Sequence, residues 1–290
     1  MSFTLSTDTS CDIFRDELKA RGIEYRPLVY TIDDVPYFDE LTRDADYKAF
    51  YDQIRAGKMP TTSQINVAEH EEFFDGLCDK CDGDIVHVTL SSGLSSTYES
   101  ACKAAEAVNA RQGRTRVYIV DSLGATIATR HVVDEAERLR DLGMSAAEAV
   151  VAVNDFIKHM QTWFMPYDLM HLKRGGRVSG ASAVIGTALR IKPILLINKD
   201  GGLSVMQKEL GATKGLNAMT DIFKKRVAKA THKVYIASAD SDLAETLKEK
   251  IKAVRPDCEV VIGWIGPVIG AHTGCNAVGV SFLSDDIRKQ

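Results

Sequence analysis

The 290-residue sequence lacks the segments that direct a chain to or across a membrane. Its N-terminus, MSFTLSTDTSCD, has no basic region followed by an apolar one, so we expect no secretory signal. Its most apolar late stretch, VVIGWIGPVIGA, is interrupted by glycines and a proline and is shorter than the roughly 20 apolar residues that span a bilayer. The sequence therefore predicts a cytoplasmic protein without a transmembrane segment.

An excess of positive charge is also missing, because 36 Lys and Arg residues are balanced by 40 Asp and Glu residues. The net charge of −4 argues against nucleic acid or an anionic membrane surface as a general partner. Neither a G-x-G-x-x-G pattern nor a P-loop occurs, so we expect no nucleotide cofactor. The composition, 45% hydrophobic and 26% charged, is that of an ordinary globular protein long enough for two domains.

Cysteine is scarce, and of the six cysteines only Cys78 and Cys81 are close in sequence. They could form half of a zinc site or a redox pair, but a structural zinc site needs four ligands and no second pair follows at a suitable spacing. The alternative is a pair of thiols packed near the C-terminus of a helix. We favour packing, and expect no metal.

In the first half, β-rich runs alternate with helical runs. This alternation predicts a parallel sheet with helices on both faces. Asn66 with Glu69, and Ser145 with Glu148, have the spacing of helix-capping boxes. The expected strands are FTLSTD, EYRPLVYT, DIVHVTL and TRVYIVDS, and the expected helices cover residues 46–57, 67–80, 96–112, 124–142 and 146–160.

The second half has a different pattern. A small-residue helix is expected at 181–190, and two apolar runs around Asp200-Gly201-Gly202 predict a hairpin. Helices at 214–230 and 241–254 then alternate with strands at 233–240 and 258–266. The predicted fold is α/β with two domains. Residues 1–163 form an N-terminal parallel-sheet α/β/α domain, and residues 164–290 form a C-terminal α+β domain with a mixed sheet.

Three clusters of hydroxyl residues, at 6–12, 60–69 and 90–98, fall where an extended segment gives way to a helix. Such turns gather at the carboxyl edge of an open α/β sheet, where helix N-termini bind anions. Plain capping explains any one cluster, but the four serines among residues 91–96 exceed what one cap requires, so we favour an anion site there. The segment SSGLS lacks the G-x-S-x-G elbow of a hydrolase.

The second half supplies candidate cations. Arg174 and Arg177 flank a Gly-Gly turn in LKRGGRVSG, and they form either a solvated loop or a site that reaches an anion across a cleft. His272 lies between glycines in GPVIGAHTG. A lone histidine is often structural, whereas flanking glycines allow the backbone to approach a ligand closely. Both interpretations remain open for each group.

Six segments occur in the order found in one family: TDTSCD, TTSQ, LSSGLSSTYESA, VYIVDSLGAT, LKRGGRVSGASAVIGTALRIKPIL and GPVIGAHTG. Together they resemble the DegV family, fatty-acid-binding proteins that include the lipid-binding subunits of bacterial fatty acid kinase. The resemblance implies a ligand tunnel between or within the two domains, a long-chain fatty acid as ligand, and a separate ATP-dependent fatty acid kinase as partner. It implies no catalytic residue and no cofactor, and a role in phospholipid metabolism.

The resemblance also implies which residues hold the carboxylate. His272 and Arg174 would lie near the head group or on the surface that faces the kinase. Ser96 stands where the family usually has glycine, which changes the backbone freedom at the helix start. Two other classes remain: an enzyme, either a serine hydrolase using Ser95 or a phosphotransferase using His272, and a structural or regulatory module. The implied head-group contacts are Thr62, Ser63, Ser92, Gly93 and Ser95.

Overall fold

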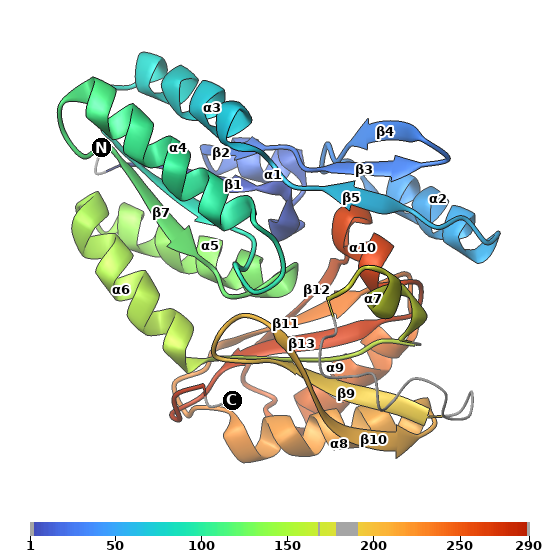
Figure 1. The fold of residues 1–290 in the computed structure, drawn as a ribbon. Helices are drawn as coiled ribbons and strands as arrows, with labels where there is room; N and C mark the ends of the chain where they lie inside the picture. The colour runs from blue at the N-terminus through green and yellow to red at the C-terminus, as the bar shows by residue number, and fades with distance from the viewer. Residues whose placement is uncertain (1–2, 168, 178–190, 289–290) are drawn as a thin grey trace.

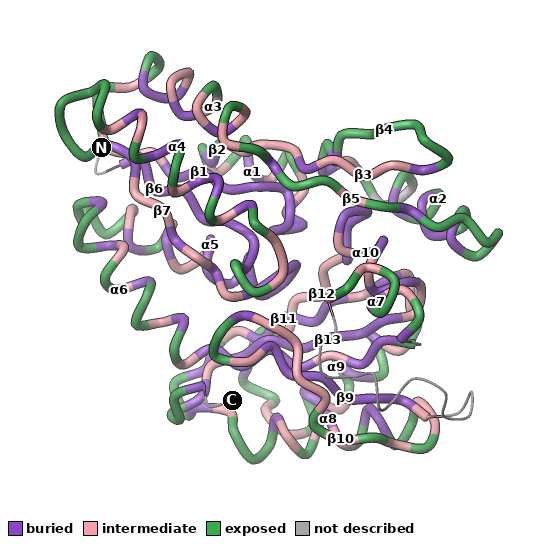
Figure 2. Tube along the Cα trace, viewed as in Figure 1, coloured by how far each residue is buried: buried purple, intermediate pink, exposed green. Residues whose placement is uncertain are grey.

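The computed structural model describes residues 3–167, 169–177 and 191–288 and contains two large sheets and one small one (Figure 1). The first large sheet is parallel, in the order β2-β1-β6-β7. Its burial is that of a central layer, because β1 and β6 are buried along most of their length (Figure 2). The strands are β1 (Phe3–Asp8), β2 (Ile23–Arg26), β6 (Asp84–Thr89) and β7 (Val117–Asp121).

Helices cover both faces of this sheet, as the alternating sequence pattern predicts. Helices α3 (Val67–Lys80) and α4 (Thr97–Gln112) pack on one face, and α5 (Ile127–Asp141) and α6 (Ala146–His159) pack on the other (Figure 1). Both predicted capping boxes form, at the starts of α3 and α6. The predicted α/β/α layering of the first half is confirmed. Two short elements, η1 (Thr9–Cys11) and α1 (Arg15–Ala20), follow β1.

The second large sheet is mixed, as predicted, in the order β10-β9-β8-β13-β11-β12. Only β11 and β12 pair in parallel, and helices α8 and α9 cover one face. Strand β8 spans the predicted boundary at residues 163/164 and belongs to this sheet. The elements are β8 (Met160–Met165), β9 (Ile191–Ile197), β10 (Leu203–Leu210), α8 (Ala212–Arg226), β11 (Lys233–Ser238), α9 (Leu243–Val254), β12 (Glu259–Trp264) and β13 (Val278–Leu283).

A small antiparallel sheet, in the order β4-β3-β5, was not predicted. The segment EYRPLVYT, expected as one strand, is divided at Pro27 and Leu28 between β2 and β3, because proline lacks the N–H that a continuous ladder requires. Helix α10 of the second half packs on this sheet and on α2, and also contacts α7. The elements are β3 (Val29–Ile32), β4 (Val35–Phe38), β5 (Thr61–Ser63), α2 (Asp44–Arg55), α7 (Met170–Arg174) and α10 (Pro267–Thr273).

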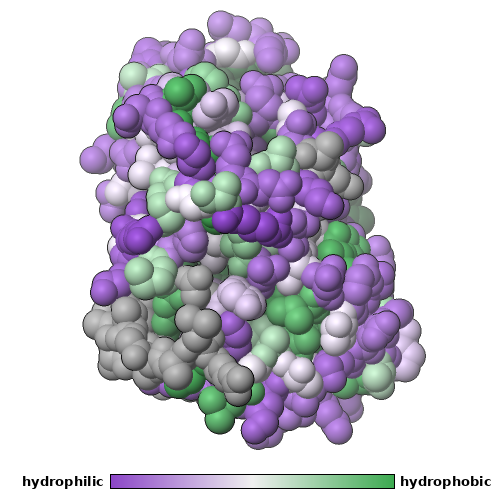
Figure 3. Space-filling model, turned by 90° about the vertical axis from the view of Figure 1, so that its right-hand side faces the viewer, coloured by the Kyte–Doolittle hydropathy of each residue, from purple (hydrophilic) through white to green (hydrophobic). Residues whose placement is uncertain are grey.

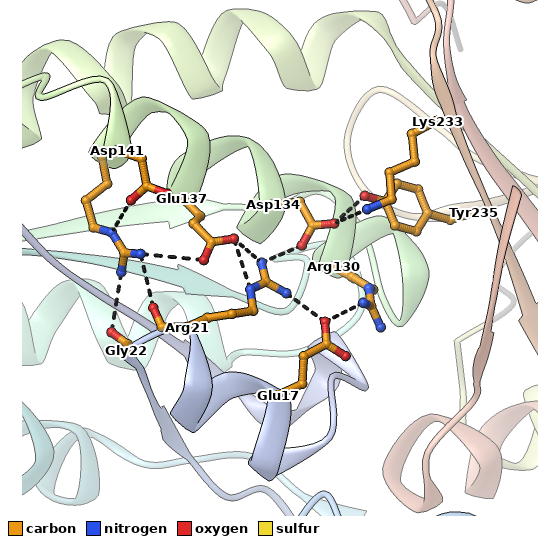
Figure 4. A network of polar contacts seen from close by, with 10 residues as sticks. Glu17, Arg21, Gly22, Arg130, Asp134, Glu137, Asp141, Lys233 and Tyr235 are labelled. Carbon is orange, nitrogen blue, oxygen red and sulfur yellow. Dashed lines mark hydrogen bonds and ion pairs between the residues drawn. The ribbon is translucent and has the colours of Figure 1, made fainter. Parts of the chain in front are cut away.

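A network of charged side chains joins the two halves (Figure 4). Asp134 of α5 lies 2.6 Å from Arg21 of α1, and its other oxygen accepts from the Tyr235 hydroxyl on β11 and lies 3.5 Å from Lys233 Nζ. Burial alone would raise the pKa of Asp134, but the charge of Arg21 and the Tyr235 hydrogen bond outweigh it and lower the pKa. Asp134 is therefore an ionised link between the halves.

The described residues bear on three features that the sequence raises: a membrane-spanning helix, a metal site and the Cys78–Cys81 pair. None of their helices is both long enough and apolar enough to cross a membrane. Within the same residues, no group of three or more His, Cys, Asp or Glu side chains is arranged to hold a metal ion. Cys78 and Cys81 are free thiols at the C-terminal end of α3, as the packing interpretation predicts. The helix expected at 181–190 lies outside the described residues.

The surface is polar over most of the face shown in Figure 3, with apolar residues grouped in its middle and lower parts. Among individual side chains, Phe38 of β4 is 61% exposed and Val151 of α6 is 71% exposed. Val35 and Tyr37 of the same strand are 49% and 43% exposed, so β4 carries a small group of exposed apolar side chains.

Candidate functional site

A pocket lies between the two halves and encloses about 860 Å³ of empty space, its mouth included. The first half contributes β5 and the loops that follow β6 and β7, so the pocket lies at the carboxyl ends of parallel strands, where α/β sheets usually bind ligands. The second half contributes β8, β9, β11 and α10.

Most of the pocket wall is apolar, and nine of the lining residues are polar. A mainly apolar cavity with some polar groups on its wall suits a ligand with a hydrocarbon body and a polar end. The apolar lining residues are Leu28, Leu90, Leu94, Ala125, Ile127, Phe164, Leu172, Ile197, Leu203, Ala237, Ile265, Val268 and Ile269. The polar ones are Thr62, Ser63, Gln64, Ser95, Thr126, Thr162, Arg177, His272 and Thr273.

Thr62 and His272, 210 residues apart in sequence, meet at the pocket wall. Thr62 Oγ1 and His272 Nε2 are 2.8 Å apart and share a hydrogen bond. If Nε2 carries the proton and donates to Thr62, the Thr62 hydroxyl is free to donate its own proton to an anion. The pair can therefore present a neutral donor to the pocket.

His272 is held in its uncharged form. Burial lowers the pKa of His272 to about 4, and the electrostatic effects of Arg177 and His171 on that pKa act in the same direction. Its ring also lies directly against Gly175, where a Cβ atom would be 2.2 Å from His272 Nδ1. Arg177, which donates from Nε to Leu94 O at 3.1 Å, supplies the positive charge on this side of the pocket. An anionic ligand would meet one guanidinium and several neutral donors.

The serine loop, residues 90–95, is shaped by backbone and carboxylate contacts. Asp8 Oδ2 accepts from Leu90 N at 2.7 Å, so a residue of the hydroxyl-rich cluster at 6–12 holds the start of the loop. The Ser95 hydroxyl is 2.9 Å from that of Thr97 and accepts from Thr97 N at 3.2 Å. No histidine among the described residues hydrogen-bonds to Ser95. In the part of the chain that the structure describes, the Ser95 hydroxyl therefore caps the start of α4 and has no histidine base beside it.

Comparison with known proteins identifies the family. A family model described as "Uncharacterised protein, DegV family" matches residues 2–285. The chain belongs to the DegV family. A DegV domain-containing protein of Clostridium perfringens is 34% identical over 285 residues, which cover 98% of both chains. The resemblance carried by the six sequence segments is confirmed.

Solved structures of DegV proteins share the fold. One, titled as showing the fatty acid binding of a DegV family protein from Thermus thermophilus, has a TM-score of 0.86 at 26% identity and covers 98% of this chain and 100% of its own. DegV of Bacillus subtilis, titled a fatty acid binding protein, has a TM-score of 0.83 at 25% identity over 98% of this chain and 100% of its own. The two-part α/β architecture is therefore that of DegV proteins.

The residues that the DegV resemblance singled out fall into two groups. Thr62, Ser63, Ser95 and His272 line the pocket. The others do not line it: Ser92 and Arg174 are exposed, and Gly93 packs against the backbone of the β9–β10 hairpin. Ser92 N donates to Asp121 Oδ1 at 3.1 Å, so Ser92 helps to fix the loop.

Several polar lining residues were not among the predicted contacts. Arg177, which the sequence offered with Arg174 either as part of a solvated loop or as a group that reaches an anion, lies in the pocket wall three residues beyond Arg174. Gln64 directly follows the predicted Thr62-Ser63 pair and also lines the wall. Thr126 adopts a left-handed φ of 55°, which no residue pattern signals. All three residues lie in segments that carry the DegV resemblance, so position in a known motif could have found them.

A buried pair of carboxyl groups lies behind α10. Asp12 and Asp39 are 5% and 2% exposed, and a Cβ placed on Gly266, just before α10, would lie 2.3 Å from Asp12 Oδ1 and 3.4 Å from Asp39 Oδ2. Burial and the mutual charge repulsion raise the pKa of Asp12 well above its usual range. Burial raises the pKa of Asp39 to about 7. The pair is therefore at least partly protonated at neutral pH.

Proposed function

We propose that this protein binds a long-chain fatty acid in the pocket between its two halves and presents the carboxylate to a separate ATP-dependent fatty acid kinase. The observation that carries the proposal is the pocket itself, a largely apolar cavity whose polar groups include the Thr62–His272 pair and Arg177. The DegV structures from Thermus thermophilus and Bacillus subtilis, titled as fatty acid binding, support the choice of ligand.

The acyl chain would be held mainly by the hydrophobic effect. Burial of a methylene contributes roughly 0.8 kcal/mol, so about fifteen methylenes give on the order of 12 kcal/mol before the costs of association are subtracted. Thr62, Ser63 and Ser95 would donate to the carboxylate as neutral groups, which leaves it anionic and able to react. Three further residues would not contact the carboxylate themselves but would shape the serine loop or contact the kinase: Ser92, Gly93 and Arg174.

The partner kinase and the cytoplasmic location belong to the same proposal. Phosphorylation of a carboxylate by ATP requires a nucleotide site, and this chain carries no P-loop pattern. Arg174, exposed at the end of α7 two residues from the pocket residue Leu172, would contact such a partner. Six free cysteines are consistent with a reducing compartment. We propose a carrier without a cofactor of its own, acting in phospholipid metabolism.

The first experiment is denaturing extraction of freshly purified protein, followed by mass spectrometry of the released small molecules. The expected result is one long-chain fatty acid per chain. The pocket-filling variant Ala237→Phe, purified in parallel, should release little or none, because Ala237 lines the pocket. Recovery of only phosphate or nucleotide from the unaltered protein would contradict the proposal.

The second experiment tests carrier against enzyme. The loaded protein is incubated with ATP, and acyl phosphate is trapped with hydroxylamine. The carrier proposal predicts no product without a partner kinase, and product formed by the pure protein would show a phosphotransferase instead. Ser95→Ala should weaken fatty acid binding, whereas a serine hydrolase would keep its ligand and lose turnover.

A further inference from the structure

The serine loop, residues 90–95, is held from the other half of the molecule by the tip of the β9–β10 hairpin, residues 198–202. Ser91 Oγ donates to Gly201 O at 2.9 Å in a fully buried contact. The contact leaves no room for a side chain at position 201, because a Cβ on Gly201 would lie 2.0 Å from Ser91 Oγ. Gly201 also has a φ of +75°, which favours glycine. The contact therefore requires both residues as they are.

Ser91 in turn organises the backbone that carries Ser95. Its hydroxyl accepts from Gly93 N at 3.1 Å, and its carbonyl accepts from Leu94 N and Ser95 N, both at 3.1 Å. Gly93 also meets the hairpin, since a Cβ there would lie 2.5 Å from Gly201 C. A displacement of the hairpin tip would be transmitted through Ser91 to the position of the Ser95 hydroxyl.

The hairpin tip is rigid enough to act as a support. The side-chain oxygen of Asn198 accepts from Asp200 N and Gly202 N, both at 3.0 Å. Arg288, which is 4% exposed, donates from Nη1 to Asn198 O at 3.2 Å and to Leu123 O at 2.9 Å. The tip is thus fixed both internally and from the C-terminal end of the chain.

We propose that the hairpin tip is a positioning element of the site: through the Ser91–Gly201 contact, the second half holds the serine loop in the form that recognises a ligand's carboxylate. Neither Ser91 nor Gly201 lines the pocket, so neither needs to touch the ligand. The inference rests on the proposed fatty acid binding. A contact between the two halves would then govern recognition of the carboxylate, whereas the apolar lining of the pocket would bind the acyl chain.

The test measures discrimination between head groups. Dodecanoic acid and 1-dodecanol, which share a chain length, each compete with fluorescent cis-parinaric acid for the unaltered protein, Ser91→Ala and Gly201→Ala. The preference for the acid over the alcohol should fall about three- to tenfold in Ser91→Ala, which is the effect of one lost hydrogen bond. It should fall further in Gly201→Ala, while the affinity for the alcohol stays constant in both.

Gly143→Ala is the matched control, because Gly143 also has a positive φ, +82°, but a Cβ there would meet nothing within 4 Å. It should keep the full preference for the acid. If Gly201→Ala does not fold, the preference of Ser91→Ala for the acid over the alcohol is sufficient to test the proposal. Unchanged preference in Ser91→Ala, or an equal loss of acid and alcohol, would overturn the positioning role and leave fatty acid binding standing. If the unaltered protein itself showed no preference for the acid, the proposed function would fail, and the inference with it.

Discussion

Replacing Asp39 with asparagine tests how the buried carboxyl pair affects folding. Burial raises the pKa of Asp39 from 3.8 to about 7, and the side chain is 2% exposed. An unfolded chain loses this proton near pH 4, whereas the folded chain keeps it up to about pH 7. Folding therefore takes up a proton between these values, and the stability that Asp39 contributes at low pH is lost as the pH rises through that interval.

The magnitude follows from the proton uptake. One pKa unit corresponds to about 1.4 kcal/mol, so the interval from pH 5 to pH 7 is worth about 3 kcal/mol in the free energy of unfolding. Asparagine does not titrate, and its side-chain oxygen can still accept from Leu41 N, which lies 3.3 Å from Asp39 Oδ1. We expect the free energy of unfolding of Asp39→Asn, relative to that of the unaltered protein, to rise by about 3 kcal/mol from pH 5 to pH 8.

The assay is guanidinium unfolding at pH 5, 6, 7 and 8 for both proteins. Buried histidines such as His70, whose pKa burial lowers to about 4, also make stability depend on pH, but they affect both proteins equally. Asp155→Asn is the control, because the Asp155 side chain is 68% exposed. Parallel stability curves for Asp39→Asn and the unaltered protein would refute the reasoning.

Three further changes test other parts of the structure. Asp134→Ala should lower the free energy of unfolding by about 2 kcal/mol, because Arg21 and Tyr235 lose the carboxylate that links the two halves. The control Asp155→Ala, at an exposed ion pair, should lower it by less than about 0.5 kcal/mol in the same denaturant titration. Ala237→Phe should weaken cis-parinaric acid binding about tenfold or more with an unchanged circular dichroism spectrum. Gly175→Ala should displace His272 and weaken binding of that probe about fivefold, and unaltered binding would show that the contact is not needed.

Local patterns predicted much of the fold. The alternation of strands and helices predicted the layered first half, and the capping boxes marked the starts of α3 and α6 correctly. The Asp200-Gly201-Gly202 turn predicted the β9–β10 hairpin. These features depend on residues that are neighbours in sequence, so periodicity and turn chemistry are enough to recognise them.

Contacts between distant segments could not be predicted in this way. Nothing in the sequence links Thr62 to His272, or Ser91 to Gly201, and both contacts depend on how the halves pack together. The small β4-β3-β5 sheet was missed because its strands are short, with three or four residues each. The choice between Arg174 and Arg177 as a pocket residue likewise depends on where the chain turns after α7.

The shared pocket wall has a consequence for how the molecule melts. Each half has its own sheet and its own apolar core, and a third apolar cluster, which includes Ile127 and Tyr235, joins the two halves. A hydrocarbon chain lodged between them would touch both and would be lost when either opened, which adds its binding free energy to the cost of opening each one. Loading would then raise the temperature at which either half opens, and the ligand would serve as a removable part of the interior.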